Sequence, residues 1–421
     1  MKMRHRLLGL VAAAAAVCGM ALPAAAADYK SEYRLSIVLA PPTPWGQAAK
    51  IWSDLVKERT QGRINIKLYP GVSLIQGDQT REFSALRQGV IDMAVGSTIN
   101  WSPQVKELNL FSLPFLMPDY AAIDALTQGS VGKKIFARLE QGGVVPLAWG
   151  ENGYREVTNS KRAIKSPADL KGMKIRVVGS PIYSDIFSAL GANPTQMSWA
   201  DAQPALSSGA VDGQENPLFL FNVLKMQNVG QKFVTAWGYV ADPLIFVVNK
   251  DIWNSWTPAD QAIVRQAALD AGKQEIAIAR KGLTEADKPA FKDIAAMGVT
   301  VTHLTPAERE AFSDLQLRPL RVGLGRLHHR LDERHATHAV LDLGVVVRDG
   351  VGLAAVQARA QVARDERAVK DDVVGALDHE EVPAVGRARD DGHALASGVE
   401  LVHAQHAEAE VARAAAHGAS H

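Results

Sequence analysis

Cysteine is almost absent from this sequence, and the central part of the chain has very little histidine. The 421 residues include one cysteine, Cys18, which excludes a disulfide framework and a metal site built from several thiolates. Between residues 28 and 312 the only histidine is His303. This region therefore lacks the side chains for a Ser-His-Asp triad, a Cys-His pair or a histidine-rich zinc site. It also has no Walker loop and no Gly-x-Gly-x-x-Gly after a predicted strand, so the sequence does not support phosphate or dinucleotide binding.

Neither sign of charge is in excess. Lys and Arg total 46 and Asp and Glu total 45, a net charge of +1, so we expect neither a nucleic acid nor an anionic membrane surface as partner. Hydrophobic residues make up 47% of the chain, which is enough for a large core. Beyond the first 27 residues no stretch approaches 18 consecutive apolar residues. We therefore expect a soluble chain of about two to three domains that is stabilised by its core rather than by disulfides.

The first 27 residues have the pattern of a Sec-type signal peptide. They open with three basic residues, Lys2, Arg4 and Arg6. An apolar run of 16 residues follows at 7–22, shorter than the roughly 20 that a helix needs to span a bilayer. We predict cleavage near Ala27, which would also remove Cys18 and change the net charge from +1 to −2. An uncleaved anchor is the alternative.

Residues 28 to about 312 alternate between strand and helix patterns. In the first half, strands are predicted at 34–39, 63–69 and 90–95, and helices at 45–60 and 78–88. The order strand-helix-strand-helix-strand predicts a parallel sheet with right-handed crossovers.

The second half repeats this order. Strands are predicted at 144–149, 154–158, 173–178, 211–216, 231–239 and 244–249. Helices are predicted at 181–190 and 199–208, after a helix start at 166–169, from Thr257 to about Ile294, and again from Thr305. Two α/β units followed by helices predict two lobes.

One charged residue stands inside an otherwise apolar strand. Arg176 lies in the predicted strand 173–178, and an arginine buried there needs an anion or a carbonyl as partner. In open α/β sheets ligands bind at the carboxyl ends of strands, and the planar guanidinium suits a carboxylate. The residues alone leave two interpretations open, an internal salt bridge to Asp or Glu and a ligand carboxylate.

A set of short motifs, taken in order and spacing, resembles one protein family. The motifs lie at residues 60–64, 69–71, 86–93, 113–116, 153–155, 170–176 and 205–217. Each is weak alone, but together they span about 280 residues from 34 to 312. They resemble the DctP-type solute-binding proteins of tripartite ATP-independent periplasmic (TRAP) transporters.

The resemblance implies an α/β periplasmic binding protein with two lobes, a hinge and an interlobe cleft. After the signal peptide 1–27, we expect lobe I at 28–152 and 242–281, and lobe II at 153–241 and 282–316. Such a protein would be a monomeric receptor, not an enzyme, that captures a small mono- or dicarboxylate by an arginine-carboxylate pair. It would deliver this acid to the TRAP permease subunits in the membrane.

The resemblance also assigns site residues. Arg176 matches the carboxylate-binding arginine, and Arg155 matches a second basic residue of the cleft, with an internal ion pair as its alternative. Asn216 matches an asparagine that hydrogen-bonds the acid, with a turn role before Pro217 as its alternative. Further candidates are Ser97, Trp199 and Trp237, although aromatic residues at such positions often belong to the core. No cofactor and no metal ion is predicted.

Two other functions stay open at this point. A secreted hydrolase would need a pair of carboxylates in the cleft, and the sequence singles out no such pair. A sensor subunit that presents the acid to a histidine kinase would share the same fold and site.

The last part of the chain has a different composition. After Phe312 the remaining 109 residues contain no Phe, Tyr, Trp, Ile, Met or Asn and hold ten of the twelve histidines. This composition is typical of a GC-rich gene translated in the wrong frame. We predict that 317–421 is a frameshifted or disordered appendage. The alternative is a metal-binding extension with His328, His329, His335, His338, His403 and His406 as ligands.

Overall fold

The computed structural model describes residues 29–284 and 288–315. The chain divides into a unit from Met1 to Asp365 and a unit from Glu366 to His421, and all described residues belong to the first. The predicted signal peptide and the predicted appendage 317–421, with its candidate histidine ligands, lie outside the described residues. Within the described ranges, no helix combines the length and the apolar composition that a bilayer crossing requires.

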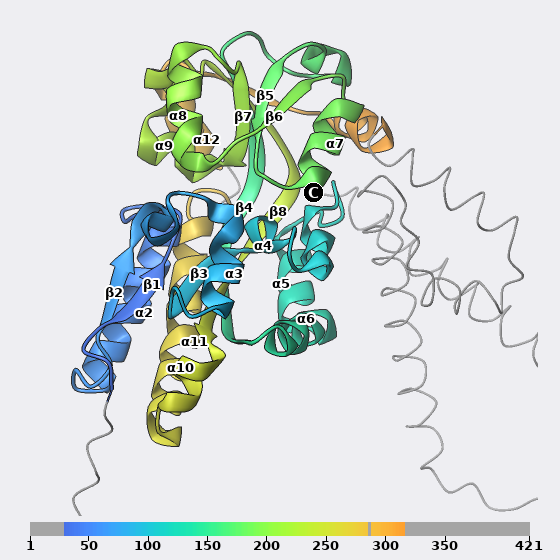
Figure 1. Ribbon diagram of the computed structural model, residues 1–421. Coiled ribbons are helices and arrows are strands. Elements are labelled where there is room, and N and C mark those ends of the chain that lie inside the picture. Colours follow the sequence, from blue (N-terminus) through green and yellow to red (C-terminus); the bar gives the residue numbers. More distant parts are fainter. Residues whose placement is uncertain (1–28, 285–287, 316–421) are drawn as a thin grey trace, which may run out of the picture. The chain divides into compact units, whose positions relative to one another are not determined.

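A nine-stranded sheet connects the described residues (Figure 1). The strands are β1 (Tyr33–Ser36), β2 (Ile66–Tyr69), β3 (Met93–Ser97), β4 (Val144–Asn159), β5 (Lys174–Val177), β6 (Asn193–Gln196), β7 (Gly213–Pro217), β8 (Phe233–Asn249) and β9 (Thr300–His303). Their order is β2-β1-β3-β8-β4-β7-β5-β6, and β9 pairs with β8. The predicted parallel pairing is present where β1 meets β2 and β3, and where β5 meets β6 and β7. It is wrong for the centre, where β8 and β4 are antiparallel to each other and to β3 and β7.

The two central strands are the longest elements of the sheet. β4 has 16 residues and β8 has 17, each a single strand where the sequence predicted two shorter ones. In the sequence, the glycines near 150 and Asp242-Pro243 resemble turns that would divide each strand in two. In the structure β4 continues through this point with a register shift between Glu151 and Gly153, and Gly153 takes a φ of +110° that favours glycine.

Helices cover this sheet (Figure 1). The α-helices are α2 (Pro44–Arg59), α3 (Glu82–Arg87), α4 (Thr98–Trp101), α5 (Tyr120–Gln128), α6 (Ser130–Gln141), α7 (Pro181–Ala189), α8 (Trp199–Ser208), α9 (Leu218–Leu224), α10 (Lys250–Ser255), α11 (Pro258–Arg280) and α12 (Pro289–Ala296). The 3₁₀ helices are η1 (Pro70–Ile75), η2 (Gln79–Arg81), η3 (Lys106–Ser112), η4 (Pro167–Leu170) and η5 (Met226–Val229). A further helix occupies 306–315.

The helix starts predicted from capping residues at Ser166, Thr257 and Thr305 are present. Ser166 and Asp169 form the expected capping box before η4, and the side chain of Thr257 accepts the Asp260 N–H at the start of α11. The predicted continuation of α11 to residue 294 is wrong, because the helix ends at Arg280. Gly282 follows with a φ of +77°, and Pro289, which has no N–H to donate, opens the separate helix α12.

The buried hydrophobic residues divide into three clusters. The largest packs α2 and α11 against β1, β3 and one end of β4 and β8, with Trp52 against Phe246 at its centre. A second surrounds β5 and α7 and includes Trp237, and a third lies around α9 and α12. Phe312, the last aromatic residue of the sequence, packs on Trp237 in the second cluster. Because β4 and β8 enter more than one cluster, they tie these parts of the fold together (Figure 1).

Glu82 at the start of α3 is a fully buried carboxyl group beside the first cluster. Ser36 Oγ donates to Oε1 at 2.7 Å and Trp101 Nε1 donates to Oε2 at 3.0 Å. Burial raises the pKa of Glu82 to about 7, against the lowering effect of these two donors. The free energy of unfolding that it contributes is therefore fully present below the unfolded pKa of 4.5 and is lost as the pH rises through about 7.

We predict that Glu82→Gln is more stable than the wild type at pH 8 by about 1–3 kcal/mol, because the amide needs no buried charge. The difference should shrink as the pH falls toward 4.5, where Glu82 is protonated in the folded state and about half protonated in the unfolded state. Urea unfolding of both proteins between pH 4.5 and 8 measures it. Equal pH dependence in the two proteins would refute the assignment.

Candidate functional site

A small cavity of about 20 Å³ lies where residues of β4, β5, β7 and β8 face residues of α2, α4 and η2. Four of the predicted site residues line it: Arg155, Arg176, Trp199 and Asn216. Four more polar residues that the sequence did not single out line it too: Gln79, Asn100, Asn152 and Asp242. This volume has room for about one water molecule. An organic acid therefore enters only if the surrounding parts move apart.

Arg176 occupies the third position of β5, and its side chain is buried, with 1% exposure. Nε and Nη2 both donate to the carbonyl oxygen of Met197, at 3.0 and 2.8 Å. The guanidinium also lies 5.5 Å from the ring of Trp199. No carboxylate of the described residues forms a salt bridge with Arg176. The internal salt bridge that the sequence left open is therefore not present in the structure.

No carboxylate of the described residues lies against the Arg176 guanidinium to neutralise its charge. Burial lowers the pKa of Arg176 to about 10, with a further lowering by the charge of Arg155 and an opposite effect of Glu215. At neutral pH the group remains charged, and the lowering from 12.5 corresponds to about 3 kcal/mol of unfavourable burial. A carboxylate placed against the guanidinium would relieve this cost.

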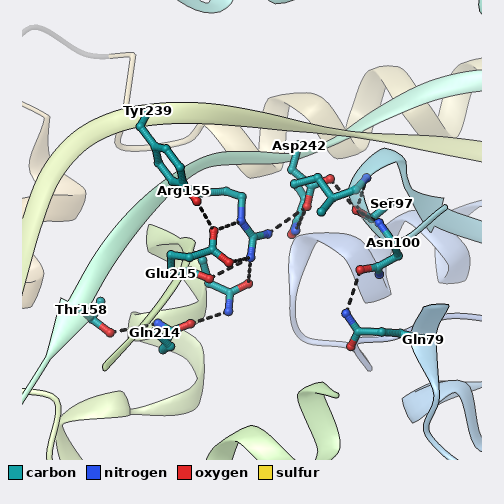
Figure 2. A network of polar contacts seen from close by, with 12 residues as sticks. Gln79, Ser97, Asn100, Arg155, Thr158, Gln214, Glu215, Tyr239 and Asp242 are labelled. Atoms are coloured by element: carbon teal, nitrogen blue, oxygen red, sulfur yellow. Dashed lines mark hydrogen bonds and ion pairs between the residues drawn. The ribbon is translucent and has the colours of Figure 1, made fainter. Parts of the chain in front are cut away.

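Arg155 on β4 is buried too, yet its charge is balanced (Figure 2). It forms a bidentate ion pair with Glu215 of β7, through Nε to Oε2 and through Nη2 to Oε1 at 2.8 Å. Its Nη1 donates to Asp242 Oδ2 of β8 at 3.1 Å, and its Nη2 donates to Asn216 Oδ1 at 3.1 Å. Burial opposes the charge, but the two carboxylates raise the pKa of Arg155 well above its usual value. Arg155 thus lines the cavity and also makes the internal ion pair that was its alternative.

A hydrogen-bonded network extends from Arg155 in both directions (Figure 2). On one side Asn216 Nδ2 donates to Gln214 Oε1, and Gln214 Nε2 donates to Thr158 Oγ1 at 3.0 Å. On the other side Asp242 accepts from Asn152 Nδ2 at 2.7 Å and from Ser97 Oγ at 2.6 Å. These bonds hold the side chains of β4, β7 and β8 in fixed positions.

Two predicted site residues lie behind the cavity rather than on it. Ser97 accepts the N–H of Ile99 at the start of α4 while it donates to Asp242, so it positions that carboxylate. Trp237 packs on Tyr239 and Phe312 in the second hydrophobic cluster, with ring centroids 4.4 and 5.4 Å away. It does not line the cavity, which agrees with its alternative role as a core residue.

Contacts between the two predicted lobes close the cavity. The backbone N–H of Trp199 donates to Gln79 Oε1 at 3.0 Å, and the hydroxyls of Ser102 and Ser180 are 3.2 Å apart. A Cβ built on Gly179 would lie 2.8 Å from Cγ2 of Thr80, with no other atom within 4 Å. This close approach depends on a residue without a side chain at position 179.

A second cavity, of about 650 Å³, is lined by Tyr154, Glu156, Trp237 and Arg309 among others. Glu156 accepts the N–H groups of Trp237 and Gly238, and burial raises its pKa to about 7. This cavity borders Thr284 and Lys288, which flank the interval 285–287 outside the described residues. We place no functional site there.

One carboxylate residue of the described chain lines the small cavity. Asp242 is the single carboxylate residue among the described residues that line it, and that carboxylate is bound by Arg155. A paired acid and base, as a hydrolase of the predicted kind needs, is not found along its wall. In the described ranges no group of three or more His, Cys, Asp or Glu is arranged to hold a metal ion.

Comparison with known proteins agrees with this geometry. The DctP model, bacterial extracellular solute-binding protein family 7, matches residues 35–319. The chain belongs to the DctP family. This confirms the family inferred from the motifs.

Two relatives of this DctP-family protein are periplasmic binding proteins. A 2,3-diketo-L-gulonate-binding periplasmic protein of Escherichia coli K12 is 36% identical over 267 residues, 63% of this chain and 79% of that protein. The C4-dicarboxylate-binding periplasmic protein DctP of Rhodobacter capsulatus is 31% identical over 314 residues, 74% of this chain and 91% of its own.

A solved structure of a TRAP periplasmic solute binding protein from Ralstonia eutropha H16, with bound (S)-2-acetolactate, is 75% identical. It superposes with a TM-score of 0.69 over 69% of this chain and 92% of its own. The predicted two-lobed α/β fold is thereby confirmed, and the DctP-family protein is a solute-binding protein of the TRAP type.

Two of the four site residues that the sequence missed share one signal. Asn152 and Asp242 are polar groups in long strands, the same signal that drew attention to Arg176. Neighbouring Gly153 and Pro243 made these positions look like turns instead.

We predict opposite effects on stability for the two buried arginines. Arg176→Met should raise the free energy of unfolding without ligand by about 1 kcal/mol, because it removes a buried charge that has no carboxylate partner. Arg155→Met should lower it by about 3–5 kcal/mol, because Glu215 and Asp242 lose their common cation. Denaturant unfolding of both variants measures these changes. A clear loss of stability in Arg176→Met would mean that Arg176 serves the fold.

Proposed function

We propose that this DctP-family protein is a periplasmic receptor that captures a small organic acid and delivers it to a TRAP permease. The carboxylate of the acid would pair with Arg176. The observation that carries this proposal is a fully buried guanidinium that lines a cavity and, among the described residues, donates its hydrogen bonds to one backbone carbonyl. A group in this state gains more from an anionic ligand than an exposed arginine does, since its charge has already lost its water.

The charge balance of the site favours a monocarboxylate. Arg155 is already compensated by Glu215 and Asp242, which leaves one guanidinium for one carboxylate. A second carboxylate on the ligand would face Asp242 and be repelled. The 75% identical relative bound (S)-2-acetolactate, a compact acid with a single carboxylate. We therefore propose a compact monocarboxylate, within the mono- or dicarboxylate class that the sequence predicted.

Closure would supply the affinity. The acid binds Arg176 on one lobe, and the polar groups of Gln79, Asn100 and Asp242 on the opposite lobe favour the closed state by contacts that the open state lacks. Closure also removes water, which strengthens the ion pair. Release would follow reopening at the permease. The lobe boundaries, the signal-peptide cleavage near Ala27, the monomeric state and the absence of catalysis stay predictions.

Ligand binding by Arg176 is tested by thermal unfolding of the full chain in the presence of a panel of small organic acids. An acid at about 100 times its dissociation constant should stabilise the wild type by about 2.7 kcal/mol. The same acid should not stabilise Arg176→Met, and it should stabilise Arg176→Lys less, because lysine cannot form a bidentate bond. The exposed Arg87→Met serves as matched control and should behave as the wild type. If the acid stabilised Arg176→Met as much as the wild type, the proposed role of Arg176 would be rejected. Degradation of a bound acid by the protein would reject the receptor function.

The role of closure is tested at Gly179. Its φ lies outside the left-handed region, so alanine fits the backbone, but the new methyl would meet Cγ2 of Thr80 across the lobes. Gly179→Ala should weaken acid binding by about three- to ten-fold without lowering stability. Adding Thr80→Ser removes Cγ2, keeps the hydroxyl that donates to Asp78, and should restore affinity. Calorimetric titration measures the acid affinity of the wild type, the single variant and the double variant. Equal affinity in all three would show that Gly179 and Thr80 do not meet in the bound state.

A further inference from the structure

The side chain of Asn152 of β4 lines the cavity, and one of its polar atoms has no hydrogen-bond partner among the described residues. The residue is 2% exposed. Its Nδ2 donates to Asp242 Oδ2 at 2.7 Å, whereas its Oδ1 has no hydrogen-bond donor. A buried acceptor without a donor is uncommon in a folded protein and usually points to a function or to a bound molecule.

The orientation of this amide is fixed by its neighbour. Asp242 also accepts from Ser97 Oγ and from Arg155 Nη1, so three donors converge on its two oxygens. Oδ2 accepts from the Arg155 guanidinium, which has no acceptor of its own, so this oxygen is an acceptor toward Asn152 as well. Turning the amide over would set the Asn152 oxygen against this carboxylate. Its nitrogen therefore faces Asp242, and its oxygen is the free acceptor.

The other amide oxygens of the cavity wall are occupied. Gln79 Oε1 accepts the Trp199 N–H at 3.0 Å, and Asn100 Oδ1 accepts from Gln79 Nε2 at 2.8 Å. Asn216 Oδ1 accepts from Arg155 Nη2 at 3.1 Å. Among the described residues of this cavity, Asn152 thus presents the one side-chain amide oxygen that lacks a donor.

We propose that Asn152 reads a hydroxyl group of the bound acid, so that the ligand class is the hydroxy monocarboxylates. The inference rests on the proposed function, since it assumes a carboxylate on Arg176. Because Arg176 and Asn152 line the same small cavity, the hydroxyl sits a short way along the ligand from the carboxylate, as in a 2-hydroxy acid. The hydroxyl donates to Asn152 Oδ1. An oxo group in its place would set an acceptor against an acceptor, and a hydrogen would leave Oδ1 without a partner.

The test compares three acids that differ at one carbon: 2-hydroxybutanoate as each enantiomer, butanoate, and 2-oxobutanoate. Calorimetric titration of the full wild-type chain should show one hydroxy enantiomer bound roughly ten- to a hundred-fold more tightly than butanoate. The oxo acid should bind no better than butanoate. This preference is measured on the wild type and does not depend on any variant folding.

Two variants then test whether Asn152 causes the preference for the hydroxy acid. Asn152→Ala should reduce the ratio of hydroxy acid to butanoate affinity to about two-fold or less, and this ratio, not the affinity for butanoate alone, is the readout. Asn100→Ala, which removes the same side chain from the same cavity, should weaken both acids alike and keep the ratio, because the Asn100 oxygen is already bound by Gln79.

Each outcome separates this inference from the proposed function. Equal binding of hydroxy acid and butanoate by the wild type would overturn the role of Asn152 and leave the receptor intact. A preference for the hydroxy acid over butanoate that persists in Asn152→Ala would also overturn the role of Asn152. The same holds if other organic acids stabilise the protein but 2-hydroxybutanoate, butanoate and 2-oxobutanoate do not. If no organic acid binds at all, the proposed function itself fails.

Discussion

The site depends on a single positive charge that the fold buries without neutralising. Arg176 lies within an apolar strand, gives both of its hydrogen bonds to the Met197 carbonyl, and meets no carboxylate of the described residues. A folded chain seldom keeps such a group, because the desolvation of a charge costs several kcal/mol and more if no ion pair forms. In the function we propose, a carboxylate ligand supplies the missing partner, so the imbalance that weakens the fold would favour binding.

Arg155 is also a buried arginine, but its charge is neutralised within the fold. Glu215 and Asp242 balance its charge, and its three guanidinium nitrogens join β4, β7 and β8 around one point (Figure 2). These bonds fix the carboxylate of Asp242, which in turn fixes the amide of Asn152. One arginine therefore organises the wall of the cavity and the other remains available to a ligand. This division follows from their neighbours and not from their residue type.

The two long strands place this arrangement where the lobes meet. β4 contributes Asn152 and Arg155, and β8 contributes Asp242. Because both strands run into more than one hydrophobic cluster, a bend in them changes the distance between Arg176 and the residues on the opposite lobe. The Gly153 bulge and Pro243 interrupt the regular ladder at this level. We therefore expect the bending that the proposed closure requires to occur here.

The sequence by itself determined the family, the alternation of strands and helices, the caps of three helices, and Arg176 as a charged residue within an apolar strand. These features are local, since periodicity, capping residues and a charge in an apolar run are all read within a few neighbours. Only the tertiary structure decided that the central strands are continuous, that Trp237 belongs to the core, that Arg155 is compensated and Arg176 is not, and that Asn152 keeps a free oxygen. Whether a buried polar atom has a partner depends on residues far apart in the chain, such as Arg155 and Asp242, and no local pattern records their distance.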